Sequence, residues 1–380
     1  MTEPPAPTGE PAPEPPAPEP QAPEARAPDP PPELRAYELP NARRVVTYGL
    51  QLAYQSSSEL RRASLYIGVL TLALLGPPLV FGVEFFAHFQ ISDLVPFTGL
   101  VDDPTAAEVN PAAVGPFLAL IFAFYAALLG WVAVAIDGQL IGVALLAARA
   151  AERAMTLREA TTRARQVFWR MIRGSFLAGL LGALVQVVVS AILVAAVGRT
   201  DTSGIIVTVI GVILLSPLGY LATGVVIGDV GAIEALKRSV RLARARPRIA
   251  VVVALFTLVT AAIQTFALFA GLDLLVRVGT FLHLGANGEV QSLVLVMLGL
   301  LAFVMAFGSL NFTIAAIVVA PQVAAFLGLT YYAGGLDRVR GVPPDARPFR
   351  WVTRPMLAVI ALASVLSVIG LLNLPASIPG

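Results

Sequence analysis

The stretch GAIEALKRSVRLARARPR, residues 231–248, places six basic residues and one acidic residue between two long apolar runs. These runs cover residues 202–228 and 249–272, and neither contains a charged residue. About 20 consecutive apolar residues are enough to cross a bilayer as a helix, and Lys and Arg are enriched in connections that stay on the cytoplasmic side. The stretch therefore predicts a basic cytoplasmic connection between two membrane spans.

The same pattern extends along the chain. Of the 380 residues, 57% are hydrophobic and only 13% are charged, whereas a soluble domain is about 25% charged. No soluble core requires so many long uncharged runs, so the sequence predicts an all-α polytopic transmembrane bundle. The other uncharged runs are residues 63–83, 109–136, 174–198, 290–336 and 355–380.

The run 290–336 is long enough to cross the membrane once or twice, and the basic residues decide between these alternatives. If the N-terminus is cytoplasmic and the run crosses once, every Lys and Arg except Arg199 and Arg277 falls on the cytoplasmic side. Two crossings would move the basic residues of 338–354 outside. We therefore expect seven spans, with the C-terminus outside. Their predicted bounds are about 63–88, 113–145, 174–198, 203–228, 249–276, 291–333 and 355–374.

Three parts of the chain differ in composition. Residues 1–34 are rich in Pro and Glu and lack apolar periodicity, which predicts a disordered cytoplasmic tail. Residues 35–341 form the predicted membrane domain, which begins with a helix at the membrane surface (35–62) and contains six spans. Residues 342–380 are expected to form a cytoplasmic loop, the seventh span and a short outer tail.

The composition also limits the chemistry that we expect. The chain has no cysteine and two histidines, and it shows no Gly-rich phosphate loop, metal-ligand cluster or Ser/His/Asp arrangement. We expect a protein that is not an enzyme, with no cofactor, no metal and no nucleic-acid partner. Lys237 is the only lysine among many arginines, a bias that indicates a GC-rich bacterial genome and hence the bacterial cytoplasmic membrane.

Two basic segments resemble each other 75 residues apart. TLREATTRARQVF (156–168) aligns with AIEALKRSVRL (232–242) through Glu-Ala pairs and through Arg163 and Arg238. Thr156 and Glu159 also have capping-box spacing. Each segment leads from an inward span to an outward one, so we expect two amphipathic surface helices that contact anionic lipid headgroups or a partner subunit. The expected contact residues are Arg163, Arg165, Lys237, Arg238, Arg241, Arg244 and Arg248.

The second segment has two expected faces. Lys237, Arg241, Arg244 and Arg248 are spaced to share one face of a helix, and Ile233, Leu236 and Val240 form an apolar stripe opposite it. Asp229, just before the segment, is expected to cap this helix.

These segments, together with LTYYAGGLDRVRG (329–341), resemble the bacterial proteins that carry the glycerophosphoryl diester phosphodiesterase membrane domain. The resemblance covers about residues 40–341 and implies a multi-span domain that is not itself catalytic. The chain has neither the length for a phosphodiesterase barrel nor its histidine set, so that activity is not expected. The seventh span is an addition to the six-span pattern of the family.

Two polar residues within the predicted spans are candidate site residues. Asp137 is flanked by apolar residues near the inner end of the second span, and Asn311 lies in the middle of the sixth. Such residues either pair within the bundle or mark a path for a solute. Two functions stay open: a scaffold or membrane-organising protein with basic cytoplasmic helices, and a transporter or permease component with a polar path near Asp137 and Asn311.

Overall fold

The computed structural model describes residues 41–89, 111–151, 155–197, 203–285, 289–330 and 352–374. These residues lie in one compact unit, Pro40–Gly380. The predicted tail 1–34 and the segment 331–351 lie outside the described residues. Every regular element in the described ranges is a helix, which confirms the all-α fold.

The helices are long, and seven stretches are long and apolar enough to cross a membrane, which confirms a polytopic membrane protein. In chain order the elements are α1 (Ala42–Gln55), α2 (Ser57–His88), α4 (Pro111–Ala150), α5 (Leu157–Val197), α6 (Ser203–Leu215), the 3₁₀ turn η2 (Ser216–Leu218), α7 (Leu221–Val226), α8 (Ala232–Ala245), α9 (Pro247–Gly285), α10 (Glu289–Thr330) and α12 (Arg354–Leu372).

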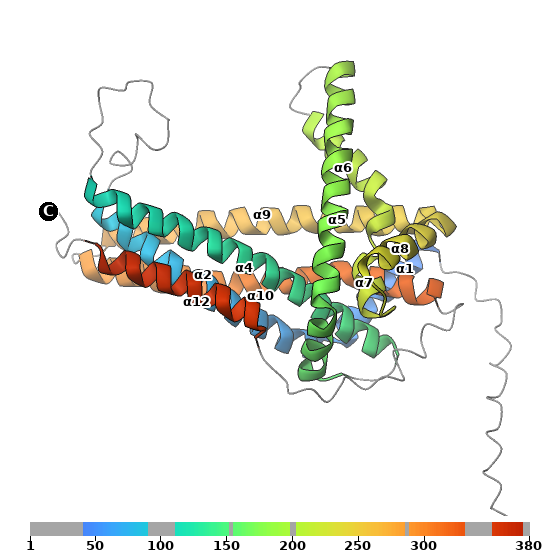
Figure 1. The fold of residues 1–380 in the computed structure, drawn as a ribbon, viewed down its shortest axis with the longest axis horizontal. Coiled ribbons are helices and arrows are strands. Elements are labelled where there is room, and N and C mark those ends of the chain that lie inside the picture. The colour runs from blue at the N-terminus through green and yellow to red at the C-terminus, as the bar shows by residue number, and fades with distance from the viewer. Residues whose placement is uncertain are drawn as a thin grey trace, which may run out of the picture. The chain divides into compact units, whose positions relative to one another are not determined.

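Five helices, α2, α4, α9, α10 and α12, run side by side as a bundle (Figure 1). Helix α10 packs against α2, α4 and α9, and α12 packs against α4 and α2. Small residues allow α2 and α10 to approach closely, since a Cβ atom at Gly308 would lie 2.5 Å from Oγ1 of Thr71. Close approach at small residues is how membrane helices gain packing energy without a hydrophobic driving force between them.

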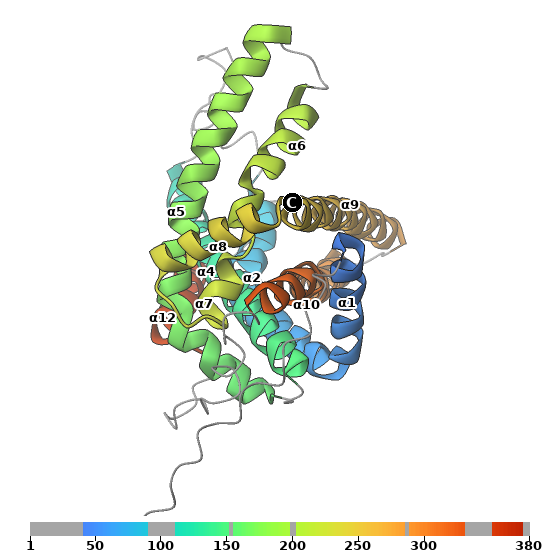
Figure 2. The same ribbon diagram turned by 90° about the vertical axis from the view of Figure 1, so that its right-hand side faces the viewer.

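Helices α5 and α6 leave this bundle at a steep angle (Figures 1 and 2). The surface helix predicted around 156–168 and the predicted span 174–198 form one uninterrupted helix, α5, rather than two elements. The second half of α5 packs against α6 and otherwise exposes its apolar side chains, with Phe176 72% and Leu184 62% exposed.

The predicted span 203–228 is broken at Pro217. Helix α6 ends at Leu215, and the 3₁₀ turn η2 and the short α7 follow. Proline has no N–H to donate to the preceding turn of an α-helix, which accounts for the break. Helix α8 docks at this break, against η2 and α7.

The internal similarity extends to burial. Helix α5 buries Ala160, Ala164 and Phe168, and α8 buries Ala235, Ser239 and Ala243, which lie 75 residues further along at each step. The two copies then differ, because α5 continues without interruption while Pro247 starts the separate helix α9. Arg246, just before this proline, has a non-helical backbone with φ −142° and ψ 71°, as the steric demand of the proline ring requires.

Candidate functional site

Helix α8 docks onto the break in the fourth span through its narrow face of small residues. The Oγ of Ser239 donates to the carbonyl oxygen of Pro217, and it accepts a hydrogen bond from the N–H of Tyr220 at 3.1 Å. These contacts satisfy backbone groups that the 3₁₀ turn leaves without helical partners. Ala235 meets Gly224 of α7, where a Cβ on the glycine would lie 3.4 Å from the Cβ of Ala235. The small residues thus form the docking face of α8, and the half-buried Leu236 and Leu242 pack against the core beside it.

The opposite face of α8 carries the cations. Lys237, Arg241 and Arg244 are exposed, and Ile233 is 62% exposed beside the half-buried Leu236 and Val240. The apolar stripe is thus a flank of the helix beside the docking face of small residues, and its Leu236 packs against the core. Arg248 differs from the expectation, because it belongs to α9 and not to the face of α8.

Few acids neutralise this surface. Glu234 pairs with Arg238 at 3.3 Å and with Arg241 at 3.5 Å. Lys237 and Arg244 make no ion pair with any residue that the structure describes. Figure 2 looks onto this end of the bundle and shows α8 and α1 there, on either side of α10. Helix α1 adds the exposed Arg43 and Arg44. We call Arg43, Arg44, Lys237, Arg241, Arg244 and Arg248 the basic end.

Arg163 lies inward, unlike the residues of the basic end. Its Nη2 donates to the main-chain oxygen of Val226 at 2.8 Å, and it lies 3.3 Å from the carboxylate of Asp229. Arg170 pairs with the same carboxylate at 2.8 Å. A cation at the last carbonyls of α7 complements the negative end of that helix. Arg163 therefore clamps α5 to the turn before α8.

Asp229 does not cap α8. The residue before this helix is Gly231, and no side chain caps its first turn. Asp229 instead has a left-handed backbone with φ 49° and points its carboxylate towards α5. The capping box at the start of α5 is confirmed: the N–H of Thr156 donates to Oε2 of Glu159 at 2.8 Å, and the N–H of Glu159 donates to Oγ1 of Thr156 at 3.3 Å.

Asp137 is fully buried where α2, α4 and α5 meet. Neither carboxylate oxygen has a hydrogen-bond partner among the described residues, and Arg165 acts on Asp137 electrostatically. Arg165 donates from Nη2 to the Oη of Tyr66 at 2.9 Å, while its Nε and Nη1 are buried and have no partner in the described part of the chain. Arg165 thus makes these interactions inside the bundle and not at its surface. The three side chains form a buried polar cluster that joins α2, α4 and α5.

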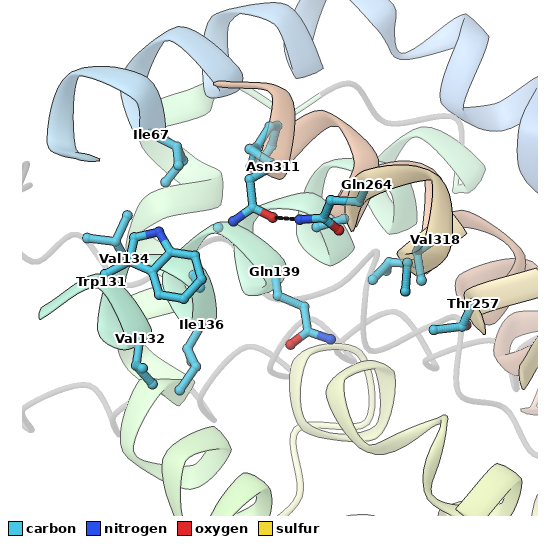
Figure 3. A pocket seen from close by; sticks show the side chains of 16 residues that line it. Ile67, Trp131, Val132, Val134, Ile136, Gln139, Thr257, Gln264, Asn311 and Val318 are labelled. Carbon is cyan, nitrogen blue, oxygen red and sulfur yellow. Dashed lines mark hydrogen bonds between the residues drawn. The ribbon is translucent and has the colours of Figure 1, made fainter. Parts of the chain in front are cut away.

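Asn311 lines a cavity of about 350 Å³ between α4, α9 and α10 (Figure 3). Its Oδ1 accepts a hydrogen bond from Nε2 of Gln264 in α9. Gln139 of α4 lines the same cavity, with Trp131 and Ile136 on one side of it and Val318 on the other. The structure therefore places Asn311 at this cavity, while Asp137 belongs to the buried cluster next to it.

Three residues of these sites were missed by the sequence reading. Ser239 belongs to a stripe of small residues. This stripe was overlooked because the prediction for the segment relied on the spacing of its cations. Tyr66 gave no signal, because its partner is 99 residues away. Gln264 did give a signal, since it is a carboxamide within the uncharged run 249–272, and such groups usually pair with another helix.

The sequence matches no family model, and neither a curated protein nor a solved structure matches it. The resemblance to the glycerophosphoryl diester phosphodiesterase membrane domain therefore stays a prediction.

Proposed function

We propose that this protein is a non-enzymatic, membrane-organising protein of the bacterial cytoplasmic membrane, whose basic end binds anionic lipid headgroups on the cytoplasmic side. One observation carries the proposal. Helix α8 uses its small residues for docking, so its cations and the exposed Ile233 stay available to the membrane.

The geometry of α8 suits a helix at the membrane interface. An amphipathic helix lies in the interface when its apolar flank enters the acyl boundary and its cations meet headgroups. Ile233 and Val240 provide that flank beside Lys237 and Arg244. Because Ser239 anchors the helix to the protein, the cations need not lose much conformational freedom on binding. Anionic lipid would thereby be held next to the bundle.

The basic end also supports the proposed orientation. Helices α2 and α9 begin at this end, and α4 and α10 end there (Figure 1). With the cations in the cytoplasm, α2 runs outward and α12 places the C-terminus outside. This is the orientation that the positive-inside tendency favours.

Lipid retention tests the proposal. The variant K237Q/R241Q/R244Q is purified in mild detergent beside the parent, and native mass spectrometry counts the bound phosphatidylglycerol and phosphatidylcholine. Each cation near the surface contributes about 1 kcal/mol, so the triple variant should retain phosphatidylglycerol roughly 100-fold less tightly. Phosphatidylcholine retention should not change.

A matched control keeps the charge and alters the side chains. In K237R/R241K/R244K the phosphatidylglycerol retention should stay close to that of the parent. Equal retention of phosphatidylglycerol by the neutral variant and the parent would refute the proposal. Loss in both variants would also refute it, because the effect would then depend on packing and not on charge.

A transporter or permease component is the second candidate, and the cavity at Asn311 is the observation that favours it. Ile136 and Gly138, on either side of the buried Asp137, both line this cavity. If the protein moves a solute past these residues, D137N and N311L should abolish growth or uptake phenotypes that K237Q/R241Q/R244Q leaves intact. The opposite pattern would support the membrane-organising function.

A further inference from the structure

The cavity at Asn311 is a groove on the surface of α10. Helix α10 packs against α4 on one side and α9 on the other, and α4 and α9 have no extensive packing with each other along the described residues. Val132 of α4 is 47% exposed, and Ala261 of α9 is also exposed; both line the cavity. The groove therefore opens sideways, towards the surface of the bundle that faces lipid.

Because α4 and α10 have the length and apolar composition of membrane spans, we infer that the groove lies near the middle of the bilayer. Asn311 is midway along the apolar stretch Val294–Gly328 of α10, and Trp131 is midway along Ala112–Ala150 of α4. At this depth the bilayer offers only hydrocarbon, so every polar group requires a partner within the protein or on a ligand. Polar side chains placed here are costly unless something satisfies them.

The groove has hydrogen-bonding capacity that the described residues do not use. Gln264 and Asn311 bond to each other, and the Nδ2 group of Asn311 and the Oε1 of Gln264 make no hydrogen bond to any other residue that the structure describes. The carboxamide of Gln139 makes no hydrogen bond with any residue that the structure describes. A lipid acyl chain in the groove would leave these donors and acceptors unsatisfied, whereas a hydroxyl or carbonyl oxygen would pair with them.

The remaining lining restricts the chemistry of an occupant. Among the described residues that line the groove, none is charged, and most are apolar, including Trp131, Ile136 and Phe312. A carboxylate or ammonium would have no counter-ion here and would lose its hydration. A volume of about 350 Å³ falls at the lower end of small-molecule sites. The lining therefore selects an uncharged molecule that is mostly apolar.

We propose that this groove binds an uncharged long-chain amphiphile that enters from the bilayer, with its hydroxyl or carbonyl oxygen held by Gln139 and by the Asn311–Gln264 pair. The apolar chain packs along Trp131, Ile136 and Phe312. This site is separate from the basic end and does not depend on the function proposed above.

Quenching of Trp131 fluorescence tests the site directly. The chain has three tryptophans, so W169F/W351F leaves Trp131 as the only emitter. The purified protein is titrated with three probes that share a brominated 18-carbon chain: 9,10-dibromo-octadecan-1-ol, 9,10-dibromo-octadecanoate and 9,10-dibromo-octadecane. The alcohol should quench saturably, with a midpoint about tenfold below those of the hydrocarbon and the carboxylate, as one net hydrogen bond would give.

Substitutions separate the polar contacts from the apolar groove. In the same background, Q139L and N311L should raise the midpoint of the alcohol to that of the hydrocarbon and leave the hydrocarbon unchanged. A315F should fill the groove and remove saturable quenching by every probe. If A315F does not fold, A261F at the exposed rim provides the same block. A361F, at an exposed alanine of α12, is the matched control and should have no effect.

Three results would overturn the proposal. Equal midpoints for the alcohol and the hydrocarbon would identify an ordinary acyl-chain groove. A carboxylate midpoint as low as that of the alcohol would identify a site for anions. Unchanged alcohol binding in both Q139L and N311L would show that these carboxamides do not hold the ligand.

Discussion

Arg165 of α5 donates a hydrogen bond from Nη2 to the Oη of Tyr66 in α2, over 2.9 Å. Arg165 also acts electrostatically on the buried carboxylate of Asp137 in α4. A buried charge costs several kcal/mol unless an opposite charge compensates it. The hydrogen bond to Tyr66 thus fixes the orientation of Arg165, whose positive charge compensates the buried negative charge of Asp137.

Removing Arg165 alone should therefore be more harmful than removing it together with the charge on Asp137. R165M is expected to lower the free energy of unfolding by about 3–5 kcal/mol, because it leaves the carboxylate uncompensated. R165M/D137N should recover most of that loss. Unfolding in mixed detergent micelles that contain increasing dodecyl sulfate measures both values. R173M, at an exposed arginine of the same helix, is the control. A double variant less stable than R165M would contradict the prediction.

Asp229 combines two contributions that different substitutions separate. Its backbone has φ 49°, and its carboxylate pairs with Arg163 and Arg170. D229N keeps a residue type that tolerates this backbone and loses only partly exposed ion pairs, so it should cost about 1 kcal/mol or less. D229V should cost about 1–2 kcal/mol more, because a β-branched residue is strained there.

Asp273 supplies the matched control for this comparison. It pairs with Arg277 at 2.8 Å on the exposed surface of α9, a regular helix. D273N and D273V should therefore differ by much less than D229N and D229V in the same unfolding measurement. If the Asn and Val variants differed by the same free energy of unfolding at both positions, a β-branched side chain would not strain the backbone at position 229.

Local spacing and charge predicted much of this structure. The capping box at Thr156 formed as expected because both partners lie within one helical turn. The long uncharged runs became helices because their backbone hydrogen bonds must be satisfied internally in lipid. The start of α9 at Pro247 also had a local signal, since the residue before a proline avoids the helical region; that signal excludes Arg248 from the face of α8.

Contacts between distant segments could not be predicted in this way. Arg163 lies in a basic segment whose spacing predicted a surface cation. The carbonyl oxygen that accepts its hydrogen bond belongs to Val226, which is 63 residues away. The cavity required Asn311 and Gln264, which are 47 residues apart, to face each other. Periodicity gives the face on which a residue lies, but it does not give the helix that packs there. The roles of Arg163, Arg165 and Gln264 therefore emerged only with the helix packing.

Gly308 should be intolerant of a side chain, whereas Gly299 on the same helix should accept one. A Cβ atom at position 308 would lie 2.5 Å from Oγ1 of Thr71, and one at position 299 would meet no atom of the described residues within 4 Å. G308V should lower the free energy of unfolding by about 1–3 kcal/mol through overpacking, while G299V should change it by less than about 0.5 kcal/mol. G308V/T71A should recover part of the loss. If G299V lowered the free energy of unfolding as much as G308V, the loss would arise from helix propensity and not from packing.

Single cysteines can test the number of crossings without altering the native chain, because it contains none. R244C at the basic end should react with a membrane-impermeant maleimide only after the cytoplasmic side is opened. N373C, at an exposed residue just beyond α12, should react in intact cells, because seven crossings place the two ends of the bundle on opposite sides.

G204C, at the exposed start of α6, decides the position of the pair α5–α6, which leaves the bundle at a steep angle (Figure 2). Its labelling in intact cells would show that the pair crosses the membrane. Labelling of G204C only from the cytoplasm, with N373C still outside, would leave five crossings and place the pair on the inner face beside the basic end. Labelling of R244C and N373C from the same side would contradict the odd number of crossings that the charge distribution predicts.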